Sequence, residues 1–233
     1  MSGEHRKGFW LTLAGALVFT PDALLIRLTA VDPFTLAFGR GLLGGIVIVV
    51  GFALYARGKF LGTVRNLGRW GALVCFLQAA CSITFYAAFS YTSVANVLVI
   101  FACTPLIAAV LSKAIFGEEV SNATRWAIVG AALGLIIVAS GSFGSIQWFG
   151  DSLALLNAVL LASIFTIIRG RREINMIPAA GIGLLLTALV AMIFAQYPVM
   201  DHIQWLALVF AGLVLLPLGL VLMTLGPRYL PAP

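Results

Sequence analysis

Two charged residues, Asp22 and Arg40, interrupt long apolar runs of the sequence. If these runs cross a bilayer, each isolated charge costs about 2.5–3.5 kcal/mol on insertion scales, so each needs a partner or water. Asp22 comes seven residues before Thr29, at the end of one run, and Arg40 comes seven residues after Pro33, at the start of the next. At about 1.5 Å of rise per residue, both charges lie about 10 Å from the same end of two antiparallel helices. We therefore expect them to pair or to share a water-filled cavity.

Two interpretations of this pair stay open. In the functional one, Arg40 receives a carboxylate or phosphate of a substrate, and Asp22 exchanges a proton or a cationic group. In the structural one, the two charges form a static ion pair that locks the first two helices together. Loss of transport in Asp22→Asn with folding retained would favour the functional interpretation.

Two prolines, Pro21 and Pro105, fall inside apolar runs, each directly after a threonine, Thr20 and Thr104. A proline inside a helix removes one backbone hydrogen bond and frees a carbonyl group. Membranes tolerate such a break only where protein or water satisfies the freed group. The sequence thus predicts hinges at Pro21 and Pro105 with Thr20 and Thr104 as binding candidates, and ordinary kinked packing is the alternative.

Further polar side chains lie within the third, fourth and sixth apolar runs. Interhelical hydrogen bonds alone could explain each of them. As a set they are candidate substrate-binding residues, because they concentrate on three helices: Gln78, Tyr86, Asn96 and Asn157.

The composition identifies the elements that must position these residues. Of 233 residues, 62% are hydrophobic and 9% are charged, and the mean hydropathy is +1.10. Soluble domains carry about 25% charged residues, so this surface must face lipid. Runs of about 20 apolar residues cross a bilayer as helices, and no run alternates with the period of a β-barrel strand. We expect an all-α polytopic bundle of about eight transmembrane helices: Phe9–Leu28, Phe34–Ala56, Trp70–Phe89, Val94–Phe116, Trp126–Ser142, Ser152–Ile168, Ile177–Ala195 and Trp205–Leu225.

The basic residues predict the orientation. Twelve of the 14 Lys and Arg residues fall in links on one side: Arg6, Lys7, Arg57, Lys59, Arg65, Arg69, Lys113, Arg125, Arg169, Arg171, Arg172 and Arg228. The opposite links contain Asp32, Asp151 and Asp201. By the positive-inside rule, the N-terminus is cytoplasmic. We expect a multi-pass protein of the cytoplasmic (inner) membrane. The net charge of +6 is therefore attributed to topology, and no nucleic-acid partner is expected.

The three cysteines and two histidines favour neither a disulfide framework nor a metal site. Cys75, Cys81 and Cys103 all fall inside apolar runs, where they serve as small packing residues. His5 and His202 are far from them in sequence. We expect no metal and no cofactor.

Weak internal repetition suggests two related halves. Tyr91 aligns with Tyr229, and Arg27 aligns with Arg169, an offset of about 140 residues or five helices. An odd number of spans per repeat inverts the second copy, an arrangement found in many secondary transporters. The predicted division is a first five-helix repeat at 1–146 and a second repeat at 147–233, in which three of five helices are present.

Four stretches in the expected order resemble the EamA family of the drug/metabolite transporter superfamily. They are DPFTLAFGRGLL around Pro33 and Arg40, Tyr91-Thr92-Ser93, FGEEV at Phe116–Val120 and GAALGLIIVASG at Gly130–Gly141. The resemblance covers almost the whole chain and implies a ten-helix carrier with both termini cytoplasmic, moving a small metabolite, often outward. Two departures are the absence of the last two helices and the Pro21-Asp22 pair in the first span.

The resulting hypothesis is a secondary transporter that works by alternating access. We expect it to export an amino acid or a related anionic or zwitterionic metabolite. The alternatives are a non-transporting structural or signalling subunit and a drug or organic-cation efflux carrier. An enzyme is not expected, because no HExxH, GxSxG or paired intramembrane aspartates are present.

Glycines in the second and fifth runs favour close helix packing, with a homodimer as the alternative: Gly41, Gly44, Gly45, Gly130 and Gly134.

Overall fold

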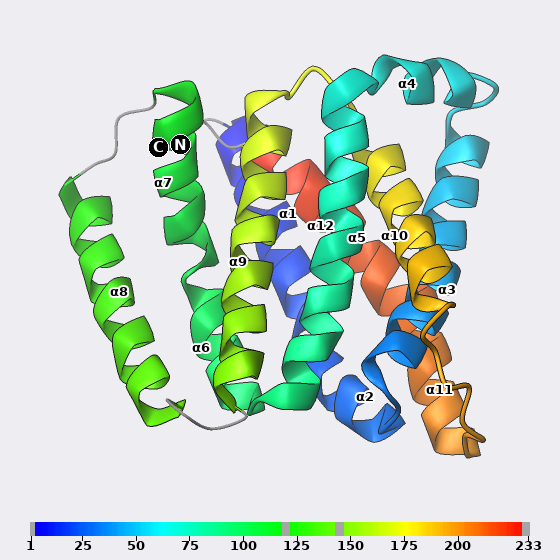
Figure 1. The fold of residues 1–233 in the computed structure, drawn as a ribbon. Coiled ribbons are helices and arrows are strands. Elements are labelled where there is room, and N and C mark those ends of the chain that lie inside the picture. The colour runs from blue at the N-terminus through cyan, green and yellow to red at the C-terminus, as the bar shows by residue number, and fades with distance from the viewer. Residues whose placement is uncertain (1–2, 118–121, 143–146, 230–233) are drawn as a thin grey trace.

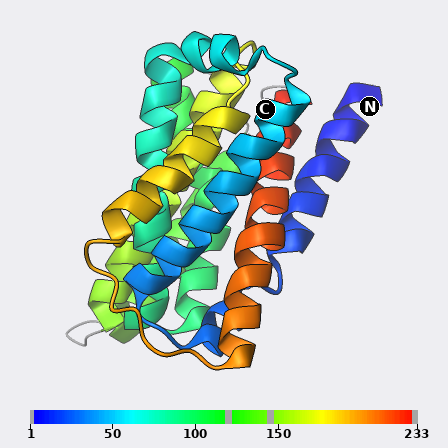
Figure 2. The same cartoon turned by 90° about the vertical axis from the view of Figure 1, so that its right-hand side faces the viewer.

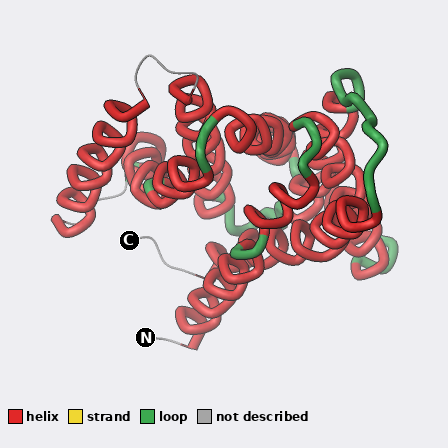
Figure 3. The backbone as a smooth tube through the Cα atoms, turned by 90° about the horizontal axis from the view of Figure 1, so that it is seen from below, coloured by secondary structure: helices red, strands yellow, loops and turns green. Residues whose placement is uncertain are grey.

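The computed structural model is a bundle of helices, described over residues 3–117, 122–142 and 147–229 (Figure 1). Within these ranges no residue is in a strand, and Figure 3 shows helices joined by loops. The predicted all-α fold is therefore confirmed. In the described part of the chain, six helical stretches are long and apolar enough to cross a membrane: Gly8–Thr29, Pro33–Tyr55, Gly68–Tyr91, Val94–Phe116, Gln147–Gly170 and His202–Gly226.

Two shorter apolar helices, Arg125–Ile137 and Ile177–Ala191, occupy the fifth and seventh places of the predicted series. Several spans consist of more than one element. The elements in chain order are α1 (Gly3–Phe19), α2 (Asp22–Thr29), α3 (Pro33–Tyr55), α4 (Phe60–Asn66), α5 (Gly68–Tyr91), α6 (Val94–Ala102), α7 (Thr104–Phe116), α8 (Asn122–Ser142), α9 (Gln147–Gly170), α10 (Ile177–Ala191), α11 (His202–Phe210), the π-helix η1 (Ala211–Leu215) and α12 (Leu216–Tyr229).

Side-chain caps fix where several of these helices begin. Asp32 accepts hydrogen bonds from the backbone N–H groups of Phe34 and Thr35, both at 3.0 Å, at the start of α3. Ser93 caps α6 in the same way, through the N–H of Asn96 at 3.1 Å. Such caps satisfy N–H groups that the helix itself cannot. They place the turns at the membrane-surface ends of the spans.

In the described part of the chain, three irregularities interrupt the α-helical spans. The first separates α1 from α2 at Thr20 and Pro21, and the second separates α6 from α7 at Cys103, two residues before Pro105. Both were predicted from the prolines. The third, the π-helix η1, was not predicted, although Pro217 follows it and π-helical turns are frequent at functional sites.

Glycines allow several helices to approach closely. A Cβ added to Gly41 of α3 would lie 2.8 Å from the backbone oxygen of Leu184 in α10. A Cβ added to Gly183 of α10 would lie 2.8 Å from the backbone oxygen of Cys75 in α5. These glycines therefore join α3, α10 and α5 into one packed layer.

Two repeats offset by five spans would relate the first span to the sixth and the third to the eighth. A contact between spans one and eight would then have its equivalent between spans six and three. The first span packs against the eighth, as α1 against α12, and the sixth packs against the third, as α9 against α5. Figure 2 shows α1 beside α12 at one edge of the bundle. The repeat itself stays a prediction, and its boundary at 146 and 147 adjoins residues 143–146, outside the described ranges.

Candidate functional site

The charges predicted to meet do so in the structure. Arg40 Nη2 in α3 donates a hydrogen bond to Asp22 Oδ1 at the start of α2. Both residues are buried, with exposed fractions of 0% for Arg40 and 4% for Asp22. The Arg40 guanidinium carbon also lies 5.2 Å from the centre of the Tyr86 ring in α5. Three spans thus converge on one buried cation.

The broken first span explains the position of Asp22. Because α1 ends at Phe19, Asp22 becomes the first residue of α2, where the helix dipole favours a negative charge. On the other side, η1 covers the backbone of Arg40: a Cβ added to Gly212 would lie 3.4 Å from Arg40 Cα. The glycine and the π-helix therefore bring the eighth span against the ion pair.

The guanidinium of Arg40 is only partly satisfied. Its Nε and Nη1 atoms are buried and have no hydrogen-bond partner among the described residues. Leaving a buried polar group unpaired costs about 1–3 kcal/mol, and more for a charged one. A carboxylate or phosphate oxygen could accept from Nε or from Nη1, which point to different sides of the planar guanidinium. These two N–H groups are the donors left for an anionic group, while Asp22 occupies Nη2.

A stripe of buried polar side chains extends from Tyr86 along one face of α5. Gln78, Ser82 and Tyr86 are spaced by four residues, so they lie above one another on the helix. Gln78 Nε2 donates to Ser82 Oγ at 3.4 Å. Gln78 and Tyr86 were predicted candidates, whereas Ser82 was missed although its spacing from both was visible in the sequence.

A second polar cluster forms at the end of the bundle that carries α2 and α11. Thr92 Oγ1 donates to Asp151 Oδ1 at 2.6 Å, and Asn96 Nδ2 donates to the two carboxylate oxygens at 3.1 and 3.2 Å. The placement of Asp151 in a link was wrong, because α9 already begins at Gln147 and buries this carboxylate. The aromatic residues before Asp151 were the missed signal that the span starts earlier.

The remaining candidates lie apart from the ion pair. Asn157 in α9 is fully buried and donates through Nδ2 to the backbone oxygen of Cys81 and, at 3.1 Å, to Thr84 Oγ1 of α5. Its Oδ1 and the Oγ1 of Thr104 are buried without a hydrogen-bond partner among the described residues.

Thr20, Pro21 and Pro105 are exposed in the structure. The Thr20 hydroxyl donates to the backbone oxygen of Ala16 at 3.4 Å, so it does not reach the ion pair. The prolines occupy the breaks predicted for them. The structure thus brings Asp22, Arg40 and Tyr86 together, while the other binding candidates do not contact the ion pair.

The described residues contain no group of three or more His, Cys, Asp or Glu side chains that could hold a metal ion. Cys75, Cys81 and Cys103 are all free thiols. At the ion pair, Asp22 and Arg40 offer charge and hydrogen-bonding groups for recognition.

Comparison with known proteins relates the chain to one family and one fold. Residues 6–140 match the EamA-like transporter family. Within that match, Glu118 of the FGEEV stretch lies outside the ranges that the structure describes. A solved structure titled "Crystal structure of protein" superposes with a TM-score of 0.76. That structure shares 21% sequence identity and the match covers 97% of this chain and 81% of the other, which shows a common fold. No curated protein matches the chain.

Proposed function

The chain belongs to the EamA-like transporter family, whose members are multi-pass membrane transporters of small molecules, and we propose that it is a secondary transporter of an anionic or zwitterionic metabolite. We further propose that it works by alternating access in the cytoplasmic membrane, as an exporter of an amino acid or a related compound. The observation that carries this proposal is the buried Arg40 with two unpaired N–H positions beside Asp22.

A zwitterion suits this site better than a simple anion. Its carboxylate would accept from Nε or from Nη1 of Arg40, and its ammonium group would donate to Asp22. Each substrate charge would then meet an opposite protein charge, which offsets the desolvation of both. In the substrate-free form the two protein charges neutralise one another, so the closed pair does not leave an isolated charge in the membrane.

The three backbone breaks supply places where the spans can bend. The break before Asp22 lies one residue from the ion pair, and η1 packs over Arg40. The second break, at Cys103, precedes the unpaired hydroxyl of Thr104. Breaks of this kind allow one part of a carrier to rock against another around a central site.

The energy source is proposed to be a gradient, since the sequence has no GxxxxGK[ST] motif for ATP. The end of the bundle that carries α4 also carries Arg57, Lys59, Arg65 and Arg69, and it is proposed to face the cytoplasm. The N-terminus would then be cytoplasmic.

Untargeted metabolite analysis of the medium from expressing cells tests this proposal. We expect one or a few carboxylate-bearing metabolites to accumulate with the native chain and to fall to the background level with Arg40→Ala. Arg27→Ala is the matched control, because Arg27 is an exposed arginine at the end of α2 and outside the ion pair. Export of organic cations alone, unaffected by Arg40→Ala, would refute the proposal.

A further inference from the structure

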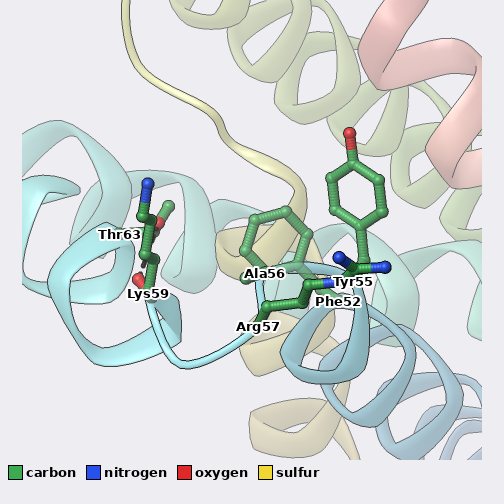
Figure 4. Close-up of a pocket in the computed structure, with 6 residues that line it drawn as sticks. All are labelled: Phe52, Tyr55, Ala56, Arg57, Lys59 and Thr63. Atoms are coloured by element: carbon green, nitrogen blue, oxygen red, sulfur yellow. Dashed lines mark hydrogen bonds between the residues drawn. The ribbon is translucent and has the colours of Figure 1, made fainter.

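The link between α3 and α4 forms a hollow that the ion-pair site does not involve. It has a volume of about 490 Å³ and is lined by Phe52, Tyr55, Ala56, Arg57, Lys59 and Thr63, which Figure 4 shows around it. Its walls combine two aromatic rings with two cationic side chains. The rings of Phe52 and Tyr55 lie 6.3 Å apart, so they form a continuous apolar side.

The two cationic side chains of this hollow are accessible to a ligand. Arg57 and Lys59 are exposed, and neither forms an ion pair with an acid among the described residues. Arg65 at the end of α4 is also exposed and unpaired in the same sense. Glu173, a described acid at this end of the bundle, lies 3.8 Å from Arg171 instead. The hollow therefore presents uncompensated positive charge.

The position of α4 places this charge at a membrane surface. Figures 1 and 2 show α4 running across the end of the bundle, whereas the spans run along it. A left-handed turn at Arg57, with φ of 43°, and Gly58, with φ of 86°, redirects the chain between α3 and α4. Exposed apolar side chains stand next to the cations, with exposed fractions of 82% for Tyr55 and 77% for Leu61.

We infer that this hollow binds the headgroup of an anionic phospholipid. Arg57 and Lys59 would contact the phosphate, while the Phe52 and Tyr55 rings would line the first part of an acyl chain. Basic residues next to a transmembrane helix attract anionic lipids, and aromatic rings favour the same depth of the bilayer. The uncompensated charge argues for an anionic headgroup over a zwitterionic one, and the apolar wall argues for a lipid over free phosphate. This inference is independent of the proposed substrate.

Native mass spectrometry of the full chain in detergent tests the inference. The probes are phosphatidylglycerol and phosphatidylcholine with identical acyl chains, added in equal amounts. The native chain is expected to retain more phosphatidylglycerol than phosphatidylcholine. In Arg57→Ala/Lys59→Ala, phosphatidylglycerol binding is expected to fall about fivefold for each basic residue removed, with phosphatidylcholine binding unchanged.

Arg6→Ala/Lys113→Ala is the matched control, because it removes two exposed positive charges from the same end of the bundle but outside the hollow. It is expected to retain the lipid preference. Thermal melting of each variant checks that the fold is kept. On the native chain, rising salt should abolish the preference, since exposed charges are screened.

Equal retention of the two lipids by the native chain would overturn the inference. So would unchanged phosphatidylglycerol binding in Arg57→Ala/Lys59→Ala. A third arm adds inorganic phosphate: if it displaces phosphatidylglycerol at equal concentration, the hollow is a site for free phosphate and the lipid assignment is wrong.

Discussion

Residue types and spacing alone were enough to predict the ion pair. Asp22 and Arg40 were predicted to lie at one depth because each is seven residues from the same end of adjacent helices, and they pair in the structure. The sequence could not show that Tyr86 would cover the guanidinium or that Nε and Nη1 would stay unpaired. These features depend on how α5 and η1 pack around α3, which is a tertiary property.

Removing one partner of this pair should destabilise the protein strongly. Arg40→Ala leaves the buried Asp22 carboxylate without its cation, and breaking a buried pair in this way costs about 3–5 kcal/mol. The double variant Asp22→Asn/Arg40→Gln carries no buried charge and should recover most of that loss. Unfolding in detergent, followed by circular dichroism, measures both. An Arg40→Ala variant as stable as the native chain would contradict this account of the pair.

Asp151 should contribute to stability through its hydrogen bonds. Asp151→Ala removes the acceptor of the Thr92 hydroxyl and of both Asn96 contacts, at an expected cost of about 1–3 kcal/mol. Asp151→Asn keeps one acceptor oxygen and should cost less. Glu173→Ala, which alters an exposed acid, is the control and should leave the melting midpoint unchanged. Equal midpoints for Asp151→Ala and Glu173→Ala would show that this cluster does not hold α5, α6 and α9 together.

At the level of helices, the apolar runs predicted the spans well, because length and hydropathy are local properties. Pro21 and Pro105 predicted two of the breaks for the same reason. The π-helix η1 was not predictable from Pro217 alone, since the same residues could have formed a kinked α-helix. The start of α9 was placed too late, because Asp151 resembled a link residue until the structure showed its buried partners.

Glycines at helix contacts and glycines facing outward should respond in opposite ways to alanine. In Gly41→Ala the new methyl group would meet the backbone oxygen of Leu184 at 2.8 Å, so α3 and α10 must separate, at about 1–3 kcal/mol. Gly134→Ala in α8 meets no atom within 4 Å and should be neutral or stabilising by up to about 1 kcal/mol. The two melting midpoints, measured in the same detergent, test the packing. A stable Gly41→Ala variant would mean that α3 and α10 are not in this contact.

At the level of the whole molecule, the basic residues predict which end faces the cytoplasm. The structure gathers Arg57, Lys59, Arg65 and Arg69 at the end that carries α4. The native cysteines are buried or half-buried within spans, so an introduced cysteine can report on accessibility.

Cysteine labelling in intact cells tests this orientation. Val199→Cys, in the exposed link after α10, should react with a membrane-impermeant maleimide in intact cells. Asn66→Cys, exposed at the end of α4, should react only after the membrane is permeabilised. The unsubstituted chain is the control for background labelling. The reverse pattern would place α4 and the N-terminus outside.

Transport by a variant that lacks both charges of the ion pair is the most direct test of the proposed function. Proteoliposomes containing the native chain or Asp22→Asn/Arg40→Gln would be loaded with a mixture of isotopically labelled amino acids, and protein-dependent efflux would be followed by mass spectrometry. We predict efflux of one or a few of these compounds with the native chain, and none with the double variant although its melting midpoint stays close to the native value. Efflux from the double variant at the native rate would contradict the account, because Asp22 and Arg40 would then be a static lock between two helices.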